Sequence, residues 1–377
     1  MRSHLNCFEV VNDFPSITAN HFLYAGEPGI IHFHLLLKTL ITNISLIKVK
    51  EVNIVHATIL FKGHLKDKTL ASSYRTISCC PLVAKALDSY LRDLNIVTWN
   101  KDQAPTQFLG QGSSHELAAL LLTEVIQFSM YTLKEPLFIL YLDAKSAFDK
   151  VIREILIRDL YFCGTTGKDL VYVSHRLGQR KTFVEWDKKM MGPVPDQVGV
   201  EQGGVNSGDY YKIYGNKQLL MAQDSCFGVE LSRDTVVSAI GQADDTVLLS
   251  NNLHILQYLI RLSLYYCQRS NVELCSDKTV LQAMAPKQLA HEMTYLKEFS
   301  PGKIKDTKLA FMNSTEHVGI VRSVEGNLPN IMTRISSHTK AISAVLHTGA
   351  ARGHHANPVA GLRLQQLYGV PVLMSCP

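Results

Sequence analysis

Three aspartates in this sequence could bind a metal ion and so carry out chemistry. Asp143 directly follows the apolar run LFILYL, and Asp244 and Asp245 stand side by side in QADDTVLLS. Adjacent carboxylates repel each other, and each is costly to desolvate beside an apolar core. The pair is therefore either a solvated turn or a site that binds something cationic.

The segments around these aspartates predict how they are positioned. The uninterrupted apolar run 137–142 predicts a strand covered on both faces. Two β-prone runs, 235–240 and 246–249, flank the aspartate pair and predict a hairpin with the pair at its tip. If the strand and the hairpin are neighbours in one sheet, the three carboxylates share one edge. Carboxylates clustered without histidine or thiolate select hard cations such as Mg²⁺, and two such ions are the usual device for nucleotidyl transfer.

Helices are expected before this strand. The apolar stretch 30–47 contains two histidines and a lysine, so it predicts a buried amphipathic helix rather than a membrane span. A second helix is predicted to begin near Leu82, because Val83, Leu87 and Leu91 recur at helical spacing.

Two further helices flank the strand in sequence. Ser113 is expected to be the N-cap of the first, with Glu116 completing a capping box. The apolar face of that helix is predicted to comprise Leu117, Leu120, Leu121 and Val125. After Asp143, the apolar spacing over 147–155 predicts one helix that ends by Gly164.

Composition sets the class of protein. The chain has 377 residues, of which 46% are apolar and 19% charged, which is typical of a globular protein with two or three subdomains. A net charge of +5 permits a nucleic-acid partner without requiring one. The eight cysteines include no C-x-x-C pair, which argues against structural zinc. The N-terminus lacks the apolar core of a signal peptide, so secretion is not expected.

Several segments, in a fixed order, resemble the reverse transcriptase domain of non-LTR (LINE-type) retrotransposons from about residue 20 to the C-terminus. Any one of them is a weak signal, but their shared order is specific. The matching segments are SSYRTIS (72–78), QFLGQGSS (107–114), FILYLDAKSAFDKV (138–151), GVEQGGVNSG (199–208), QADDTVLLS (242–250), SNVELCSDKT (270–279), EHVGI (316–320) and AGLRLQQLYGVPVL (360–373).

The resemblance implies an α+β right-hand polymerase fold with fingers, a palm whose antiparallel sheet packs on helices, and a partial thumb. The expected regions are fingers at 1–135, palm at 136–290, and a post-palm hairpin with partial thumb at 291–377. The implied function is that of an RNA-directed DNA polymerase, which extends a DNA 3′ end on an RNA template. Its partners would be RNA template, DNA primer and deoxynucleoside triphosphates, with no membrane, and the oligomeric state stays open.

The resemblance also assigns the metal site. Asp143, Asp244 and Asp245 would bind two Mg²⁺ ions, for which Mn²⁺ can substitute, with Asp143 and Asp244 as main ligands. Lys278 would contact the triphosphate or give a proton to the leaving pyrophosphate; a surface lysine that ends a turn is the alternative.

Four further residues would bind the nucleotide. Phe148, five residues after the first aspartate, would leave no room for a ribose 2′-hydroxyl and so select deoxynucleotides. Gln202 and Gly203 would lie beside the nascent base pair, and Arg75 would bind the triphosphate or the template. Basic patches, including the one at 176–181, would follow the template–primer backbone. Without the resemblance, Phe148 is equally well a helix core residue and Arg75 a solvated side chain.

Two positions depart from the family's pattern: Gln242 stands where an aromatic residue is usual, and Gly208 where proline is usual. No endonuclease is visible, so the chain resembles a fragment of an element. A group II intron-type reverse transcriptase is a near variant. The alternative from another class is a truncated, inactive nucleic-acid-binding remnant. The family implies the nucleus or cytoplasm of a eukaryotic cell, and the sequence leaves the compartment open.

Overall fold

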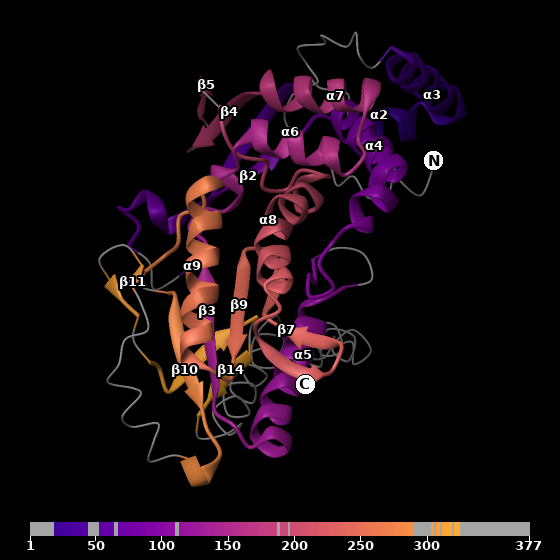
Figure 1. The fold of residues 1–377 in the computed structure, drawn as a ribbon. Coiled ribbons are helices and arrows are strands. Elements are labelled where there is room, and N and C mark those ends of the chain that lie inside the picture. The colour runs from indigo at the N-terminus through magenta and orange to yellow at the C-terminus, as the bar shows by residue number, and fades with distance from the viewer. Residues whose placement is uncertain are drawn as a thin grey trace, which may run out of the picture. The chain divides into compact units, whose positions relative to one another are not determined.

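A computed structural model describes residues 19–43, 53–63, 67–109, 113–186, 189–194, 197–276, 278–289, 303–304, 307–309, 311–318 and 320–324. The chain divides into two compact units (Figure 1). The first unit comprises Met1–Gln103, Ser146–Lys217 and Gln268–Val272, and the second comprises Ala104–Lys145, Gln218–Cys267 and Glu273–Pro377. Each unit is therefore assembled from segments that are distant in sequence.

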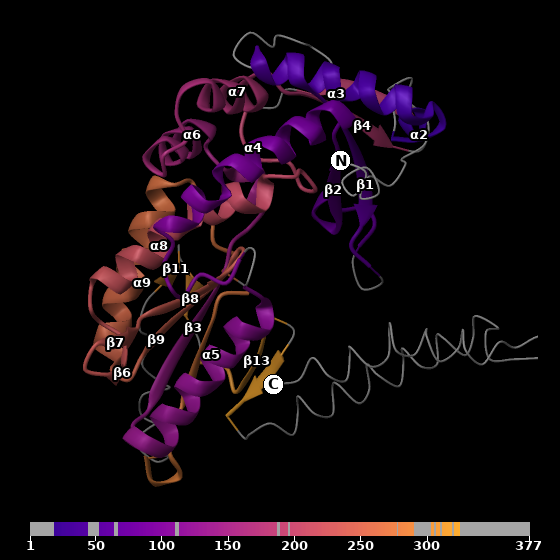
Figure 2. The same cartoon turned by 90° about the vertical axis from the view of Figure 1, so that its right-hand side faces the viewer.

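The first unit joins helices to a four-stranded sheet. Its strands are ordered β2-β1-β4-β5, with β1 antiparallel to β2 and parallel to β4 (Figure 2). The strands are β1 (Ile54–Phe61), β2 (Tyr74–Cys79), β4 (Lys181–Trp186) and β5 (Lys189–Val194). The helices are α2 (Ala19–Tyr24), α3 (Gly26–Thr42), α4 (Leu82–Lys101), α6 (Arg153–Phe162), α7 (Gly167–Gly178) and the first part of α8 (Ser207–Asp224), with short 3₁₀ turns η3 (Ala71–Ser73) and η5 (Phe148–Lys150).

The core of the first unit lies where α4, α6, α7 and α8 meet. Val55, Leu87, Leu91, Trp99 and Leu156 are fully or almost fully buried there. The helix predicted to begin near Leu82 is confirmed as α4. Helix α3 covers the described part of the stretch 30–47, and residues 44–47 lie outside the described residues.

The second unit is built on an antiparallel sheet in the order β10-β3-β9-β8. Its strands are β3 (Leu137–Asp143), β8 (Ala239–Gln242), β9 (Asp245–Ser250) and β10 (Val280–Met284). Three small hairpins accompany it: β6 (Val229–Ser232) with β7 (Thr235–Val237), β11 (Lys303–Ile304) with β12 (Thr307–Lys308), and β13 (Ser314–His317) with β14 (Ile320–Ser323). The helices are α5 (His115–Gln127), which continues as π-helix η4 (Phe128–Leu133), α9 (Leu253–Arg269) and the short η6 (Lys287–Leu289).

Burial of the central strand follows from its composition. The first six residues of β3 are buried, as the uninterrupted apolar run predicts for a strand between two others and covered on its faces. The hairpin around the aspartate pair is confirmed as β8 and β9. Its first strand is shorter than predicted, because residues 235–237 form β7 and pair with β6. The hairpin expected near residue 316 is confirmed as β13 and β14. The thumb-side segment 360–373 lies outside the described residues, and the three predicted regions stay a prediction.

The predicted start of α5 is wrong by one residue. The N-cap is Ser114, whose hydroxyl accepts a hydrogen bond from the Leu117 backbone N–H at 3.3 Å. The predicted apolar face is also wrong except at Val125: the buried side chains are those of Ala118, Ala119, Leu122 and Val125, and Leu117 and Leu120 are exposed. By length and composition alone the stretch His115–Leu133 could cross a membrane, but this buried face is part of the unit's core.

The predicted helix over 147–155 is also wrong, because the chain is extended at Val151 and Ile152 between η5 and α6. The cause is a tertiary contact. The carbonyl of Phe148 accepts a hydrogen bond from Val200 N–H at 2.8 Å, and that of Val151 accepts one from Gly199 N–H at 2.7 Å. Carbonyls that a helix would use internally are thus bound by another segment. Helix α6 ends at Phe162, shortly before Gly164, which has φ +98°.

Candidate active site

The three aspartates meet at one edge of the second unit's sheet. Asp143 is the last residue of β3, Asp245 is the first of β9, and their Cα atoms are direct partners in the antiparallel register. Asp244 lies in the two-residue turn between β8 and β9, where Ala243 has φ +54°. A non-glycine residue in this left-handed region is uncommon and often marks a functional turn. The predicted juxtaposition of these carboxylates is confirmed.

This edge carries surplus negative charge. Burial, together with the neighbouring charges of Asp244 and Asp143, raises the pKa of Asp245 to about 6, while Lys278 opposes the shift. The Lys278 ammonium lies 3.1 Å from a carboxylate oxygen of Asp143. Desolvation would lower the pKa of Lys278, but the hydrogen bond and attraction to Asp143 outweigh it and the pKa is raised. A cation is therefore favoured beside these carboxylates.

Backbone contacts bring Lys278 to the aspartates. The segment before it lies along the end of β3, where Cys275 N–H donates to the Asp143 carbonyl at 2.8 Å. Lys145 N–H donates to the Glu273 carbonyl at 2.7 Å, and Lys278 N–H donates to the Cys275 carbonyl at 3.2 Å. The position of Lys278 is thus set by the fold, while its side chain is 65% exposed and can move.

The donor chemistry of this edge fits a hard divalent cation. Its side-chain donors include three carboxylates, whose oxygens are the type that Mg²⁺ prefers. Over the part of the chain that the structure describes, no group of three or more His, Cys, Asp or Glu side chains is arranged to hold a metal ion. In this arrangement Lys278 contacts Asp143, so binding of a cation there requires the exposed lysine to turn away.

Gln202 and Gly203 lie in a turn of the first unit, here called the Gln-Gly turn, which is hydrogen-bonded to β2. Ser78 N–H donates to the Gln202 carbonyl at 2.8 Å. Gly203 has φ +99°, and a Cβ there would lie 3.2 Å from the Ser78 carbonyl oxygen, so the close approach favours glycine. Arg75 lies exposed on the same strand, β2, and Ile77, on the same face of that strand, also approaches Gly203. The structure therefore brings Gln202 and Gly203 to the strand that carries Arg75.

Phe148 contacts α8 and the residues just before the Gln-Gly turn. Its ring is half-buried and stacks on Tyr211 of α8, with centroids 4.9 Å apart and planes 23° apart. Its carbonyl is bound by Val200, two residues before Gln202. The sequence did not single out Tyr211, although the run of tyrosines after the Gln-Gly turn was a signal for it.

The eight predicted residues thus form two groups. The aspartates and Lys278 lie in the second unit, and the four other residues predicted to bind the nucleotide lie in the first. That the two groups act on one substrate stays a prediction.

A buried ionic cluster includes Glu201, the residue directly before Gln202. Arg176 on α7 lies 2.9 Å from a carboxylate oxygen of Glu201 and 3.6 Å from one of Asp88 on α4. The Cys80 thiol donates to Glu201 at 3.0 Å, and Tyr172 donates to Asp88 at 2.9 Å. Burial raises the pKa of Asp88 to about 6, although Arg176 lowers it. The prediction that Arg176 contributes to a surface patch for nucleic acid is wrong, because its side chain is 5% exposed.

The two departures from the family's pattern are accommodated locally. Gln242 is the register partner of Asp245 and so places an amide beside the carboxylates. Gly208 lies in the first turn of α8, where a Cβ would meet nothing within 4 Å. Proline is tolerated in the first turn of a helix, so the same helical backbone accommodates either the family's usual proline or the glycine of this chain.

Gly199→Ala should destabilise the first unit by about 1–3 kcal/mol. Gly199 has φ +83°, and a Cβ there would lie 2.7 Å from the Asp149 carbonyl oxygen, which is backbone and cannot move aside cheaply. Gly208→Ala is the matched control and should change stability by less than about 1 kcal/mol, in the stabilising direction. Urea unfolding measures both, and equal midpoints for the two variants would contradict the close approach at Gly199.

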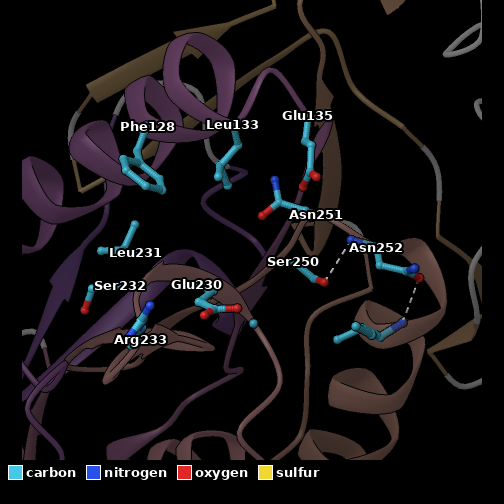
Figure 3. A pocket seen from close by; sticks show the side chains of 12 residues that line it. Phe128, Leu133, Glu135, Glu230, Leu231, Ser232, Arg233, Ser250, Asn251 and Asn252 are labelled. Atoms are coloured by element: carbon cyan, nitrogen blue, oxygen red, sulfur yellow. Dashed lines mark hydrogen bonds between the residues drawn. The ribbon is translucent and has the colours of Figure 1, made fainter.

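A pocket of about 500 Å³ in the second unit lies away from the aspartates (Figure 3). It includes Ser250, at the opposite end of β9 from Asp245. Its polar groups serve local structure: the Ser250 hydroxyl accepts from Asn252 N–H, and the Asn252 side chain accepts from Ile255 N–H at the start of α9. The remaining lining includes Phe128, Leu133, Glu135, Glu230 and Arg233. The pocket is therefore separate from the candidate active site.

Comparisons with known proteins agree with this geometry. The sequence model of a family described as reverse transcriptase (RNA-dependent DNA polymerase) matches residues 64–312. No curated protein sequence matches the chain. The structure of apo telomerase from Candida tropicalis, truncated from the C-terminal domain, is similar with a TM-score of 0.50 and 13% identity, over 73% of this chain and 54% of that chain.

The structure of Candida tropicalis telomerase in complex with a TWJ fragment of telomeric RNA is similar with a TM-score of 0.50 and 12% identity, over 88% of this chain and 56% of that chain. The chain thus spans about half the length of the solved telomerase chains that it matches. At such low identity the likeness concerns the fold, and together with the family match it confirms the predicted α+β right-hand polymerase fold.

Proposed function

The chain belongs to the reverse transcriptase (RNA-dependent DNA polymerase) family, and from this premise we propose that it extends a DNA 3′ end on an RNA template by two-metal nucleotidyl transfer. One observation carries the proposal: Asp143 and Asp245 are direct partners across β3 and β9, with Asp244 in the adjoining turn. A single sheet edge thereby presents three carboxylates, as nucleotidyl transfer requires. Its substrates would be deoxynucleoside triphosphates.

We propose that Asp143, Asp244 and Asp245 hold two Mg²⁺ ions, with Mn²⁺ able to substitute. When bound, the ions would lower the pKa of the primer 3′-hydroxyl and neutralise charge on the leaving pyrophosphate. Lys278, held beside Asp143 by the backbone of residues 273–278, would contact the triphosphate or donate a proton to the pyrophosphate.

The first unit supplies the proposed nucleotide contacts. Phe148 would close off the space of a ribose 2′-hydroxyl, with Tyr211 stacked behind its ring. Gln202 and Gly203 would lie beside the nascent base pair, and Arg75 would bind the triphosphate or the template. Hydrogen bonds from Val200 to Phe148 and from Ser78 to Gln202 support a common role for these segments.

Phe148→Ala should raise incorporation of ribonucleotides relative to deoxynucleotides by roughly 10–100-fold, because a hole opens where the ring excluded one hydroxyl. Phe148→Tyr keeps the ring and is expected to retain the selectivity of the unchanged protein. Single-nucleotide incorporation with each triphosphate measures the ratio. Unchanged selectivity in the alanine variant would remove the sugar-selecting role.

The proposed origin is a non-LTR (LINE-type) retrotransposon, of which this chain would contain the reverse transcriptase domain. The ordered segments from 72–78 to 316–320 support this origin, and the family match covers most of them. The expected compartment is the nucleus or cytoplasm of a eukaryotic cell.

Primer extension tests the proposed function. The purified chain is given a DNA primer on an RNA template, the four deoxynucleotides and Mg²⁺, beside an Asp244→Asn/Asp245→Asn control. Metal-dependent product above that control is the expected result. Absence of such product would overturn the polymerase function and leave the inactive nucleic-acid-binding remnant.

A further inference from the structure

Three aromatic side chains gather at one end of the first unit's sheet. Phe61 and Tyr74 are direct partners across β1 and β2, with ring centroids 5.3 Å apart. Tyr74 in turn meets Trp186 of β4 edge to face at 5.3 Å. The Trp186 side chain is 44% exposed and its neighbour rings are partly exposed. We call Phe61, Tyr74 and Trp186 the aromatic platform.

The aromatic platform lies on the opposite face of the sheet from Arg75, one of the predicted nucleotide contacts. Side chains alternate along a strand, so Arg75, which follows Tyr74, points to the other face. Val55 and Ala57 share the face of Phe61, and both are fully buried. The platform therefore continues the unit's buried face outward, past the end of the core, and is separate from the Gln-Gly turn.

Positive charge accompanies the rings. The Lys68 ammonium lies over the Phe61 ring, 5.8 Å from its centroid, and the Tyr74 hydroxyl donates to the Lys68 carbonyl at 2.8 Å. Lys189 is exposed and is the register partner of Trp186, so it lies on the same face. The exposed Glu185 adjoins Trp186 in sequence and points to the other face.

We propose that this platform binds a single-stranded nucleic acid, with bases stacked on the rings and phosphates beside Lys68 and Lys189. Exposed rings bind unpaired bases because every base has a π-face, and lysines beside them neutralise the backbone. An apolar protein partner would gain nothing from the two lysines, so charge complementarity favours the nucleic acid. Naming the RNA template as the natural strand rests on the proposed function; the binding itself does not.

The two tryptophans of the chain make the platform observable. Trp99 has no exposed surface, whereas Trp186 is 44% exposed, so quenching by a stacked base reports on Trp186. The full chain is titrated, in EDTA to prevent catalysis, with a single-stranded RNA, a single-stranded DNA of the same sequence and a blunt duplex. Both single strands should quench the fluorescence, and the duplex, whose bases are stacked internally, should not.

Variants then test the role of the ring by anisotropy of a labelled single strand. Trp186→Ala should weaken binding by about tenfold, and Trp186→Phe, which keeps a ring, by less than about twofold. Phe162→Ala is the matched control, because Phe162 is an aromatic residue 72% exposed on α6, and it should bind unchanged. Lys68→Ala and Lys189→Ala should each reduce the salt dependence of binding by about 0.7 in the slope of log K against log salt.

Binding of the Trp186→Ala variant as tight as that of the unchanged chain, or equal quenching by the duplex, would overturn the platform. The outcome is independent of catalysis. Quenching without any primer extension would keep the platform and remove the polymerase, and extension without quenching would do the reverse. If RNA quenches and DNA does not, the platform binds the template strand alone; equal quenching assigns it to either single strand.

Discussion

Asp143→Asn is expected to slow primer extension by roughly a thousandfold. A bound divalent ion stabilises the charge of the transition state by several kcal/mol, and loss of about 4 kcal/mol corresponds to that factor. Asparagine keeps the shape of the side chain, so the pairing of residue 143 with Asp245 should persist. Single-nucleotide incorporation at saturating primer–template measures the loss, and a rate within tenfold of the unchanged chain would contradict a metal-binding role for Asp143.

Asp143→Asn should lower activity without lowering stability, and this difference distinguishes a functional role of Asp143 from a structural one. Asp143 contributes to the repulsion that raises the pKa of Asp245, so its neutralisation relieves like charge at the sheet edge. The ion pair lost with Lys278 is largely exposed and contributes little. Asp143→Asn should therefore unfold at the same temperature or slightly higher. Asp234→Asn, at an exposed turn position of the same unit, is the control and should alter neither activity nor stability.

The geometry of the aspartates was predictable because each local segment carries its own signal. An apolar run of strand length specifies a buried strand, and two β-prone runs around a short polar pair specify a hairpin. Once the two are neighbours in one antiparallel sheet, residues at their ends must meet. The register that sets Asp143 against Asp245 follows from these constraints.

The segment after Asp143 was not predictable in the same way. Its apolar spacing is that of a helix, yet residues 151–152 are extended because the carbonyls of Val151 and Phe148 accept hydrogen bonds from Gly199 and Val200. Those partners are some 50 positions away in the chain, and local pattern contains no information about them. The start of α5 differs by less: Ser113 and Ser114 are both suitable cap residues, and in the structure Ser114 is the N-cap.

The burial of Arg176 was not predicted from the sequence, since arginines are rarely buried unless they are paired. Its burial depends on Asp88 and Glu201, which lie on other segments and pair with it in the folded chain. Glu201 immediately precedes Gln202, so the cluster connects the stability of the first unit to the placement of the Gln-Gly turn.

Arg176→Met is expected to lower the free energy of unfolding by about 3–5 kcal/mol at neutral pH. Methionine fills a similar volume, but Asp88 and Glu201 are left buried without the cation that lies between them. Urea unfolding measures the loss. Arg233→Met, at an exposed position of the second unit, should have little effect and controls for the substitution itself.

The dependence of this loss on pH distinguishes charge from packing. The folded-state pKa of Asp88 is about 6, above its value in an unfolded chain, so the stability that this group contributes falls as the pH rises through 6. Removal of Arg176 takes away the attraction that lowers this pKa, so the pKa rises further and the penalty at pH 7.5 grows. At about pH 5 the carboxyl is protonated in the variant and much of the penalty disappears.

The deficit of Arg176→Met should therefore be smaller at pH 5 than at pH 7.5, whereas a cavity would cost the same at both. Arg176→Met/Glu201→Gln should recover part of the lost stability at neutral pH, because the buried charge of Glu201, which then faces only the more distant Arg180 guanidinium at 3.8 Å, is removed. An equal deficit at both pH values, without recovery in the double variant, would assign Arg176 to packing alone. The double variant could be more stable than Arg176→Met and still extend primers no faster. That result would show that the charge on Glu201, and not only its volume, holds the Gln-Gly turn in place.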